Sequence, residues 1–281
     1  MKVFEPALAE MANEKLDTYG PVSFKEYLEK HELDKSKKTA QCISIDSVTS
    51  LAKELRDAGV MVFRLGARPE ANTTHFALAK CSKGWDDFFL DDRKLVSAAA
   101  PEVFVPSTSP RRLFAFHLLP KLTENSLVTL GVASGLLQDA LGIDEDHEQV
   151  VPATGQSTFT FKILPKSHMP EPWDHIRGQV EVDALFSGRR EGEECLFLVE
   201  AKSGDPNGTL AKHKLCYPLA ALRKEVPSHI KIVPVYLKTW PERDGQHFLV
   251  TECTHGNNDP VVISDLESSD VWHMVIQGFG G

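Results

Sequence analysis

The stretch "LFLVEAKSG" (residues 196–204) decides the fold, because four apolar residues lead directly into a charged pair. Such an apolar run is typical of a strand in the middle of a sheet. Side chains alternate along a strand, so Glu200 and Lys202 are expected on one side and Ala201 on the other. A carboxylate and an ammonium placed in this way are either an ordinary surface pair or half of a catalytic site.

The residues upstream predict a partner strand. "GQVEVDALFSG" (178–188) alternates like a strand, and the charged turn "RREGEE" (189–194) separates it from "CLFLVEAK" (195–202). A turn this short predicts an antiparallel hairpin. In the first of these strands the alternation places Val180, Val182 and Ala184 on one face and Glu181 and Asp183 on the other. The hairpin then brings Asp183 beside Glu200, with Lys202 just beyond.

Two carboxylates that converge on one point repel each other unless a cation lies between them. Mg²⁺ takes oxygen ligands and often uses only one or two carboxylates, with water and substrate phosphate completing its shell. A lysine beside such a metal can orient the attacking water and balance the charge that grows on the phosphorus centre. The predicted chemistry is metal-assisted hydrolysis of a phosphodiester.

The elements around the hairpin predict an α/β protein with a mixed sheet. From residue 111 the pattern reads as two helices broken at Pro120, the second capped by Thr123, and then a strand at 157–165 before the hairpin. A helix within 203–226 and strands at 230–238 and 247–253 follow, and a final helix is expected at 264–279. The helical crossover after the hairpin predicts that 195–202 and 230–238 are parallel.

The N-terminal part predicts a smaller α/β region. Residues 1–40 read as polar and helical, a capped helix is expected within 44–59, and 60–66 and 74–81 read as two paired strands. Three prolines predict a linker at 101–110. We therefore expect an N-terminal region at 1–105, for specificity or dimerisation, and a catalytic domain at 106–281.

Composition narrows the class of protein. Hydrophobic residues at 42% and charged residues at 25% are typical of a soluble globular chain, and no apolar run is long enough to span a membrane. The five cysteines form no Cys-x-x-Cys pair, and acids near the N-terminus argue against a signal peptide, so a reducing, cytoplasmic location is expected. The net charge of −9 argues against a protein that coats nucleic acid nonspecifically.

The pattern of Asp183, sixteen intervening residues and then Glu200-Ala201-Lys202 resembles the active-site motif of the PD-(D/E)xK nucleases. The order of elements from 111 to about 238 is similar to the αβββαβ core of that superfamily, a restriction-endonuclease-like mixed sheet flanked by helices. The resemblance implies that Asp183, Glu200 and the backbone carbonyl of Ala201 bind Mg²⁺ and that Lys202 assists the nucleophile. It also implies an auxiliary acid on the preceding helix, for which Glu124 is the candidate.

Glu181 and Tyr217 are further auxiliary candidates from the same resemblance. Tyr217 matches the tyrosine of a Gln-x-x-x-Tyr motif that one subgroup carries, although His213 stands where that subgroup has glutamine. The proline that often precedes the first acid is absent, and Glu181-Val182 occupies its place. Four basic residues are candidate nucleic-acid contacts or else solvated surface charges: Arg189, Arg190, Lys212 and Lys214. A second acid-x-Lys triplet, Asp92-Arg93-Lys94, lacks a hairpin partner that carries an acid.

The resemblance implies a Mg²⁺-dependent endonuclease for double-stranded DNA, similar to a prokaryotic type II restriction enzyme. Symmetric cleavage of a duplex requires two sites, so a homodimer is expected. Two alternatives remain open. One is a structure-specific or repair nuclease of the same superfamily, acting on branched, damaged or single-stranded DNA. The other is a non-catalytic binding module with a nuclease fold, within a defence complex.

Overall fold

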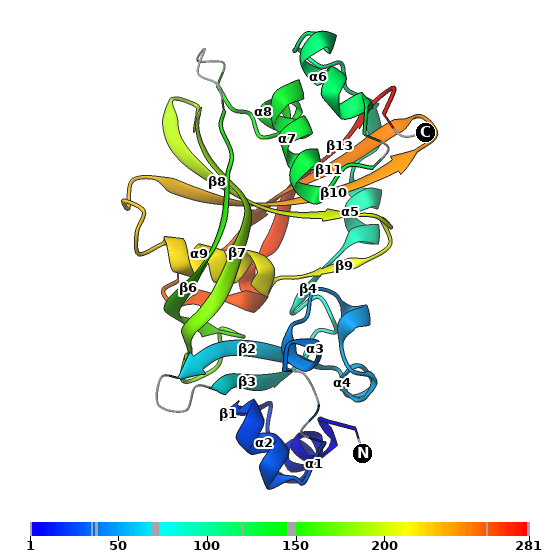
Figure 1. The fold of residues 1–281 in the computed structure, drawn as a ribbon. Coiled ribbons are helices and arrows are strands. Elements are labelled where there is room, and N and C mark those ends of the chain that lie inside the picture. The colour runs from blue at the N-terminus through cyan, green and yellow to red at the C-terminus, as the bar shows by residue number, and fades with distance from the viewer. Residues whose placement is uncertain are drawn as a thin grey trace.

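The computed structural model describes residues 2–34, 36, 39–68, 73–119, 121–144, 150–256 and 258–279. Within these residues the protein is a mixed α/β structure built on an eleven-stranded mixed sheet with helices on both faces (Figure 1). None of its described helices is long and apolar enough to cross a membrane. The fold class predicted from the sequence is therefore confirmed at the level of a mixed sheet flanked by helices.

The centre of the sheet contains four strands: β6 (Ala153–Leu164), β7 (Trp173–Arg190), β8 (Glu193–Ser203) and β10 (Lys231–Glu242). β7 and β8 pair antiparallel across a tight turn, in which Glu191 and Gly192 both have positive φ, as a type I′ turn requires. β8 and β10 pair parallel, with helix α9 (His213–Leu222) in the connection between them. Both strand-pairing predictions are confirmed.

Two hydrophobic cores lie on opposite faces of this sheet. Helices α6 (Pro110–His117), α7 (Glu124–Ser134) and α8 (Leu136–Ala140) contribute to one, which we call the α7-side core; it contains Leu130, Phe197 and Phe248. The other, the α9-side core, contains Leu198, Leu215 and Tyr236. Successive β8 residues alternate between them, as a strand buried on both faces must.

The N-terminal region extends the same sheet at one end of the molecule (Figure 1). Strands β2 (Val60–Arg68) and β3 (Thr73–Lys80) pair antiparallel as predicted. β2 joins β7 where Gly66 lies opposite Ile176. The described helices of the N-terminal region are α1 (Glu5–Glu14), α2 (Phe24–Lys30), α3 (Thr39–Ile43), the 3₁₀ turn η1 (Val48–Ser50), α4 (Lys53–Ala58) and α5 (Asp92–Ala98).

Three expectations about secondary structure are wrong. Residues 18–23, expected to be helical, form β1 (Thr18–Ser23) beside β3. The expected linker contains β5 (Pro101–Val103), paired with β13. The expected final helix is instead η2 (Ile263–Asp265) followed by strand β13 (Glu267–Ile276), which pairs with β11 (Gly245–Thr254). Short strands β4 (Phe89–Asp91), β9 (Thr209–Ala211) and β12 (Val261–Val262) complete the fold.

A β-bulge in β7 changes which face its residues occupy. Against β6, the pairing moves from Val182 to Leu185 on β7 while β6 moves only from Gly155 to Ala153. One extra residue in β7 therefore shifts its alternation. Val182 packs against the α9-side core and Ala184 lies in the α7-side core, so the expectation that they share a face is wrong.

Candidate active site

Glu200 is the most deeply buried acid of the predicted site. It lies near the end of β8, between β7 and β10, and only 3% of its surface is exposed. Its Oε1 atom lies 3.0 Å from Nζ of Lys202 and 3.7 Å from Nζ of Lys214. Among the described residues no group donates a hydrogen bond of good geometry to this oxygen. A buried carboxylate oxygen is thus flanked by two cations and open to a further ligand.

The charges around Glu200 are strongly coupled. Burial raises the pKa of Glu200 to about 7, against the opposing effect of Lys214 and Lys202, and the charge of Asp183 raises it further. Burial acts to lower the pKa of Lys202, but the charge of Glu200 outweighs it and leaves that pKa raised. The pKa of Lys214 is raised for the same reason. Both lysines are therefore ammonium groups at neutral pH.

Asp183 faces the same corner from β7. The hairpin register pairs Ala184 with Val199 and Leu185 with Leu198, so the next positions on the two strands are Asp183 and Glu200. Leu198 contributes to the α9-side core, so Glu200, two residues further along β8, projects toward that side. The charge of Asp183 acts on both Glu200 and Lys202, so its carboxylate lies near them. Oδ2 of Asp183 accepts a hydrogen bond from the backbone N–H of Ala201 at 2.8 Å.

Glu124 reaches the site from the first turn of α7. Thr123 caps this helix as predicted, its Oγ1 accepting the backbone N–H of Ser126 at 3.2 Å. Oε1 of Glu124 accepts the backbone N–H of Ser203 at 2.9 Å, and its Oε2 lies 4.0 Å from Nζ of Lys202. The structure thus brings Asp183, Glu200, Lys202 and Glu124 together.

A second buried ion pair lies beside this group and was not anticipated from the sequence. Tyr236 and Lys238 of β10 lie opposite Glu200 and Lys202 in the parallel register. Both contact Asp92 at the start of α5: the Tyr236 hydroxyl donates to Oδ1 at 3.0 Å, and Nζ of Lys238 lies 3.2 Å from Oδ2. The sequence signal that could have indicated this pair was the i, i+2 spacing of Tyr236 and Lys238 in an otherwise apolar strand, which places both side chains on one face.

The remaining basic candidates occupy different environments. Lys212 is buried, with Nζ donating to the carbonyl of Ser264, which argues against the expected nucleic-acid contact. Arg190 forms an ion pair with Glu252, at 2.7 Å, and lies over the ring of Phe197. Arg189 is exposed on the hairpin turn. Lys214 points to Glu200 and also lies 3.6 Å from Asp46.

A pocket of about 280 Å³ adjoins the site on the side of Lys214. Its lining includes Glu181, which is exposed, and Tyr217, which is buried with its hydroxyl donating to the carbonyl of Arg64. Three buried nitrogens on its wall have no hydrogen-bond partner among the described residues: Nδ1 of His175, Nδ1 of His213 and Nε of Arg64. Tyr217 therefore lines this neighbouring pocket, with Lys214 between it and Glu200.

Comparison with protein families identifies a family domain that contains most of this site. Residues 105–261, more than half of the chain, match the model of the domain of unknown function DUF6997. The chain belongs to this family. Comparisons with curated proteins and with solved structures find no match.

The DUF6997 region contains the four grouped residues Glu124, Asp183, Glu200 and Lys202. It does not contain Asp92 or Asp46, the acids that pair with Lys238 and Lys214. Both acids come from the N-terminal region, whose side chains share the α9-side core with α9 and β8. The site is therefore assembled from the family domain and the residues that precede it.

Proposed function

We propose that this protein is a Mg²⁺-dependent endonuclease of the PD-(D/E)xK type that hydrolyses double-stranded DNA. The observation that carries the proposal is the buried Glu200 carboxylate, beside Asp183 and 3.0 Å from Lys202, whose Oε1 accepts no hydrogen bond of good geometry from the described residues. The element order α7, α8, β6, β7, β8, β9, α9, β10, with β8 and β10 parallel, also supports a restriction-endonuclease-like core.

The donor set fits a hard divalent cation. Asp183, Glu200 and the carbonyl of Ala201 would hold Mg²⁺, which prefers oxygen ligands and retains several waters. When bound, this ion supplies Lewis-acid stabilisation of the phosphate and a more acidic water. The raised pKa of Glu200 means that protons compete for the same oxygens near neutral pH.

The side chains of the protein have distinct roles in the proposed reaction. Lys202 stays protonated, so it orients the attacking water and balances negative charge on the phosphate rather than removing a proton. Glu124 positions Lys202 and the end of β8 through its contacts with Nζ and with the backbone of Ser203. Lys214 offsets the charge of Glu200 and borders the pocket, where a nucleotide next to the scissile phosphate would lie.

Cleavage of both strands of a duplex requires two sites, so we propose that the active form is a homodimer. Sequence would be read by side chains against base edges in the grooves. Arg189, exposed at the tip of the β7–β8 hairpin, is available for a phosphate contact.

The test is plasmid cleavage with Mg²⁺ by wild type, D183N, E200Q and K202A, with thermal unfolding as a check on folding. We expect each of the three variants to lose at least a thousandfold in cleavage rate. The matched control is K94A, which alters the lysine of the other acid-x-Lys triplet, an exposed side chain paired with Asp86. Near wild-type cleavage by folded E200Q would refute the assignment of the site.

Substrate preference separates the alternatives. Discrete bands from a linear duplex support a restriction-type enzyme, whereas cleavage only at flaps, junctions or ends identifies a structure-specific nuclease at the same site. DNA or protein binding without cleavage, unchanged in K202A, identifies a non-catalytic module and overturns the proposal.

A further inference from the structure

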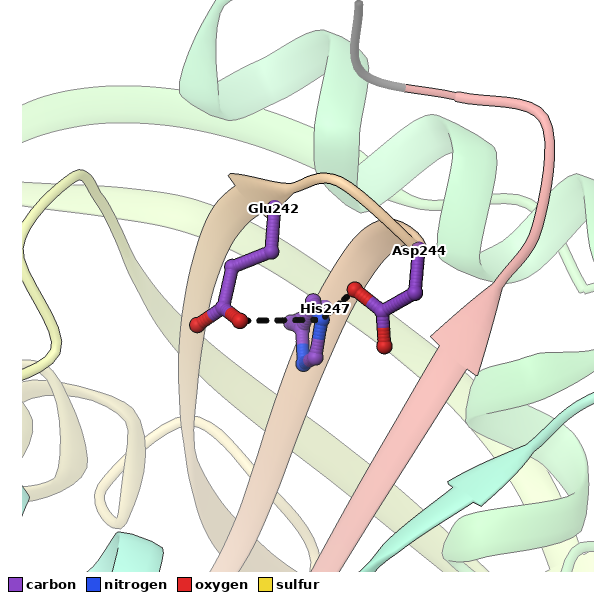
Figure 2. Close-up of side chains that lie close together, drawn as sticks. All are labelled: Glu242, Asp244 and His247. Atoms are coloured by element: carbon purple, nitrogen blue, oxygen red, sulfur yellow. Dashed lines mark hydrogen bonds and ion pairs between the residues drawn. The ribbon is translucent and has the colours of Figure 1, made fainter.

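A second group of metal-ligating side chains lies at the tip of the β10–β11 hairpin. Glu242 ends β10, Asp244 lies in the turn, and His247 lies on β11 (Figure 2). One ligand atom from each residue lies within 4.8 Å of the others. Glu242 is six residues beyond Tyr236, the neighbour of Glu200, so the strand rise separates this tip from the candidate active site by roughly 20 Å.

The distances show three electron-rich atoms directed at one point. Nε2 of His247 lies 2.9 Å from Oδ1 of Asp244 and 3.9 Å from Oε2 of Glu242. A single proton on Nε2 accounts for the contact with Asp244, but 3.9 Å is too long for a hydrogen bond to Glu242. Ligands bound about 2.0–2.2 Å from one ion lie roughly 3–3.5 Å apart, so a small movement brings all three to a common metal.

Neighbouring residues hold two of these ligands in place. Nε1 of Trp240 donates to Oε1 of Glu242 at 2.7 Å, which leaves Oε2 directed at His247. Nδ1 of His247 lies 2.9 Å from Nε2 of His273, and the ring of His247 stacks on Trp240. A metal-binding histidine is usually oriented by such a hydrogen bond from its second ring nitrogen. His247 and His273 are both buried, so this orientation is fixed by packing.

We propose that Glu242, Asp244 and His247 bind one first-row divalent transition metal, of the Zn²⁺ or Co²⁺ type. An imidazole and two carboxylates favour such ions over Mg²⁺, which prefers oxygen ligands alone. The two carboxylates balance the charge of the ion, and solvent completes the shell because both acids are more than half exposed. The bound ion would join the turn to both strands and stabilise the hairpin. This structural role does not depend on the proposed nuclease chemistry.

The experiment titrates untagged, chelator-treated protein with Co²⁺ in a buffer that contains Mg²⁺, followed by visible absorption and by thermal unfolding. We expect one Co²⁺ per chain, a new absorption band and a raised Tm. The variants E242Q and D244N keep hydrogen-bond acceptors for Trp240 and His247 but remove the negative charges. Each is expected to weaken Co²⁺ binding at least tenfold.

The control variant D183N alters the candidate active site and leaves this hairpin unchanged. It is expected to bind Co²⁺ like wild type in this assay, so loss of nuclease activity and loss of this metal are separate results. Two outcomes overturn the proposal. One is wild-type protein that binds no Co²⁺, and the other is folded D244N and E242Q that bind Co²⁺ with wild-type affinity.

Discussion

The buried histidines beside the candidate site are expected to make the protein sensitive to mild acid. Burial lowers the pKa of His213 to about 3 and that of His175 to about 4, with the charges of Lys214 and Arg64 acting in the same direction. In the unfolded chain both are near 6.5. Protons therefore bind the unfolded state preferentially, so this stability is complete above pH 6.5 and is lost as pH falls toward 4.

The size of the effect follows from these pKa values. Between pH 8 and pH 5, each histidine removes about 2 kcal/mol from the free energy of unfolding, because the unfolded form gains a proton that the folded form does not. Together they remove about 4 kcal/mol, a large part of the roughly 5–15 kcal/mol by which most domains are stable.

Urea unfolding at pH 8 and pH 5, followed by tryptophan fluorescence, measures this loss in wild type, H213Q and the control H229Q. Glutamine does not titrate, so H213Q is expected to lose about 2 kcal/mol less than wild type between the two pH values. His229 is exposed, so its replacement is expected to leave the difference unchanged. Contributions from carboxylates cancel in this comparison. Equal pH dependence in H213Q and wild type would refute the reasoning.

Two further predictions concern the N-terminal region. G66A should destabilise the fold by about 3 kcal/mol or more, because φ is +75° and a Cβ would lie 2.0 Å from the carbonyl oxygen of Ile176. The matched variant G84A has the same φ but open space around the Cβ, so it should cost only about 1 kcal/mol. D87A should cost about 3–5 kcal/mol by leaving Lys166 buried and unpaired, whereas D86A, which breaks the exposed pair with Lys94, should cost less than about 1 kcal/mol. Urea unfolding of each matched pair tests both, and equal costs within a pair would contradict them.

The part of the fold that could be predicted from sequence is the part fixed by local signals. The β7–β8 hairpin was predicted from two strand-like segments joined by a short, charged turn. The alternation of side chains along each strand then predicts which residues lie side by side. The cap at Thr123 likewise fixes where α7 begins and hence where Glu124 lies. Asp183, Glu200, Lys202 and Glu124 could be grouped because each occupies such a locally determined position.

Other elements depended on contacts that local patterns do not encode. In β13 the run from Val271 to Ile276 is apolar at every position except His273, and such a run cannot be told from a buried helix by its pattern alone. The bulge in β7 was missed because one extra residue leaves the composition of the strand unchanged. The sequence gives Asp92 no hairpin partner, and its actual partners, Tyr236 and Lys238, lie about 145 residues away, where no local pattern connects them.

The long-range pairing of Asp92 shows that residues before the DUF6997 region contribute to the surroundings of the candidate site. Lys238 lies next to Lys202 on the neighbouring strand and is almost fully buried, so without Asp92 its ammonium group would be a buried charge that lacks this counter-charge. An unpaired buried charge costs several kcal/mol, more than the net gain of most single contacts. The backbone N–H of Asp92 also donates to the carbonyl of Gly208, in the loop that follows β8. The residues before 105 therefore supply both a counter-charge and a backbone contact beside the candidate site, so the functional unit extends beyond the DUF6997 region.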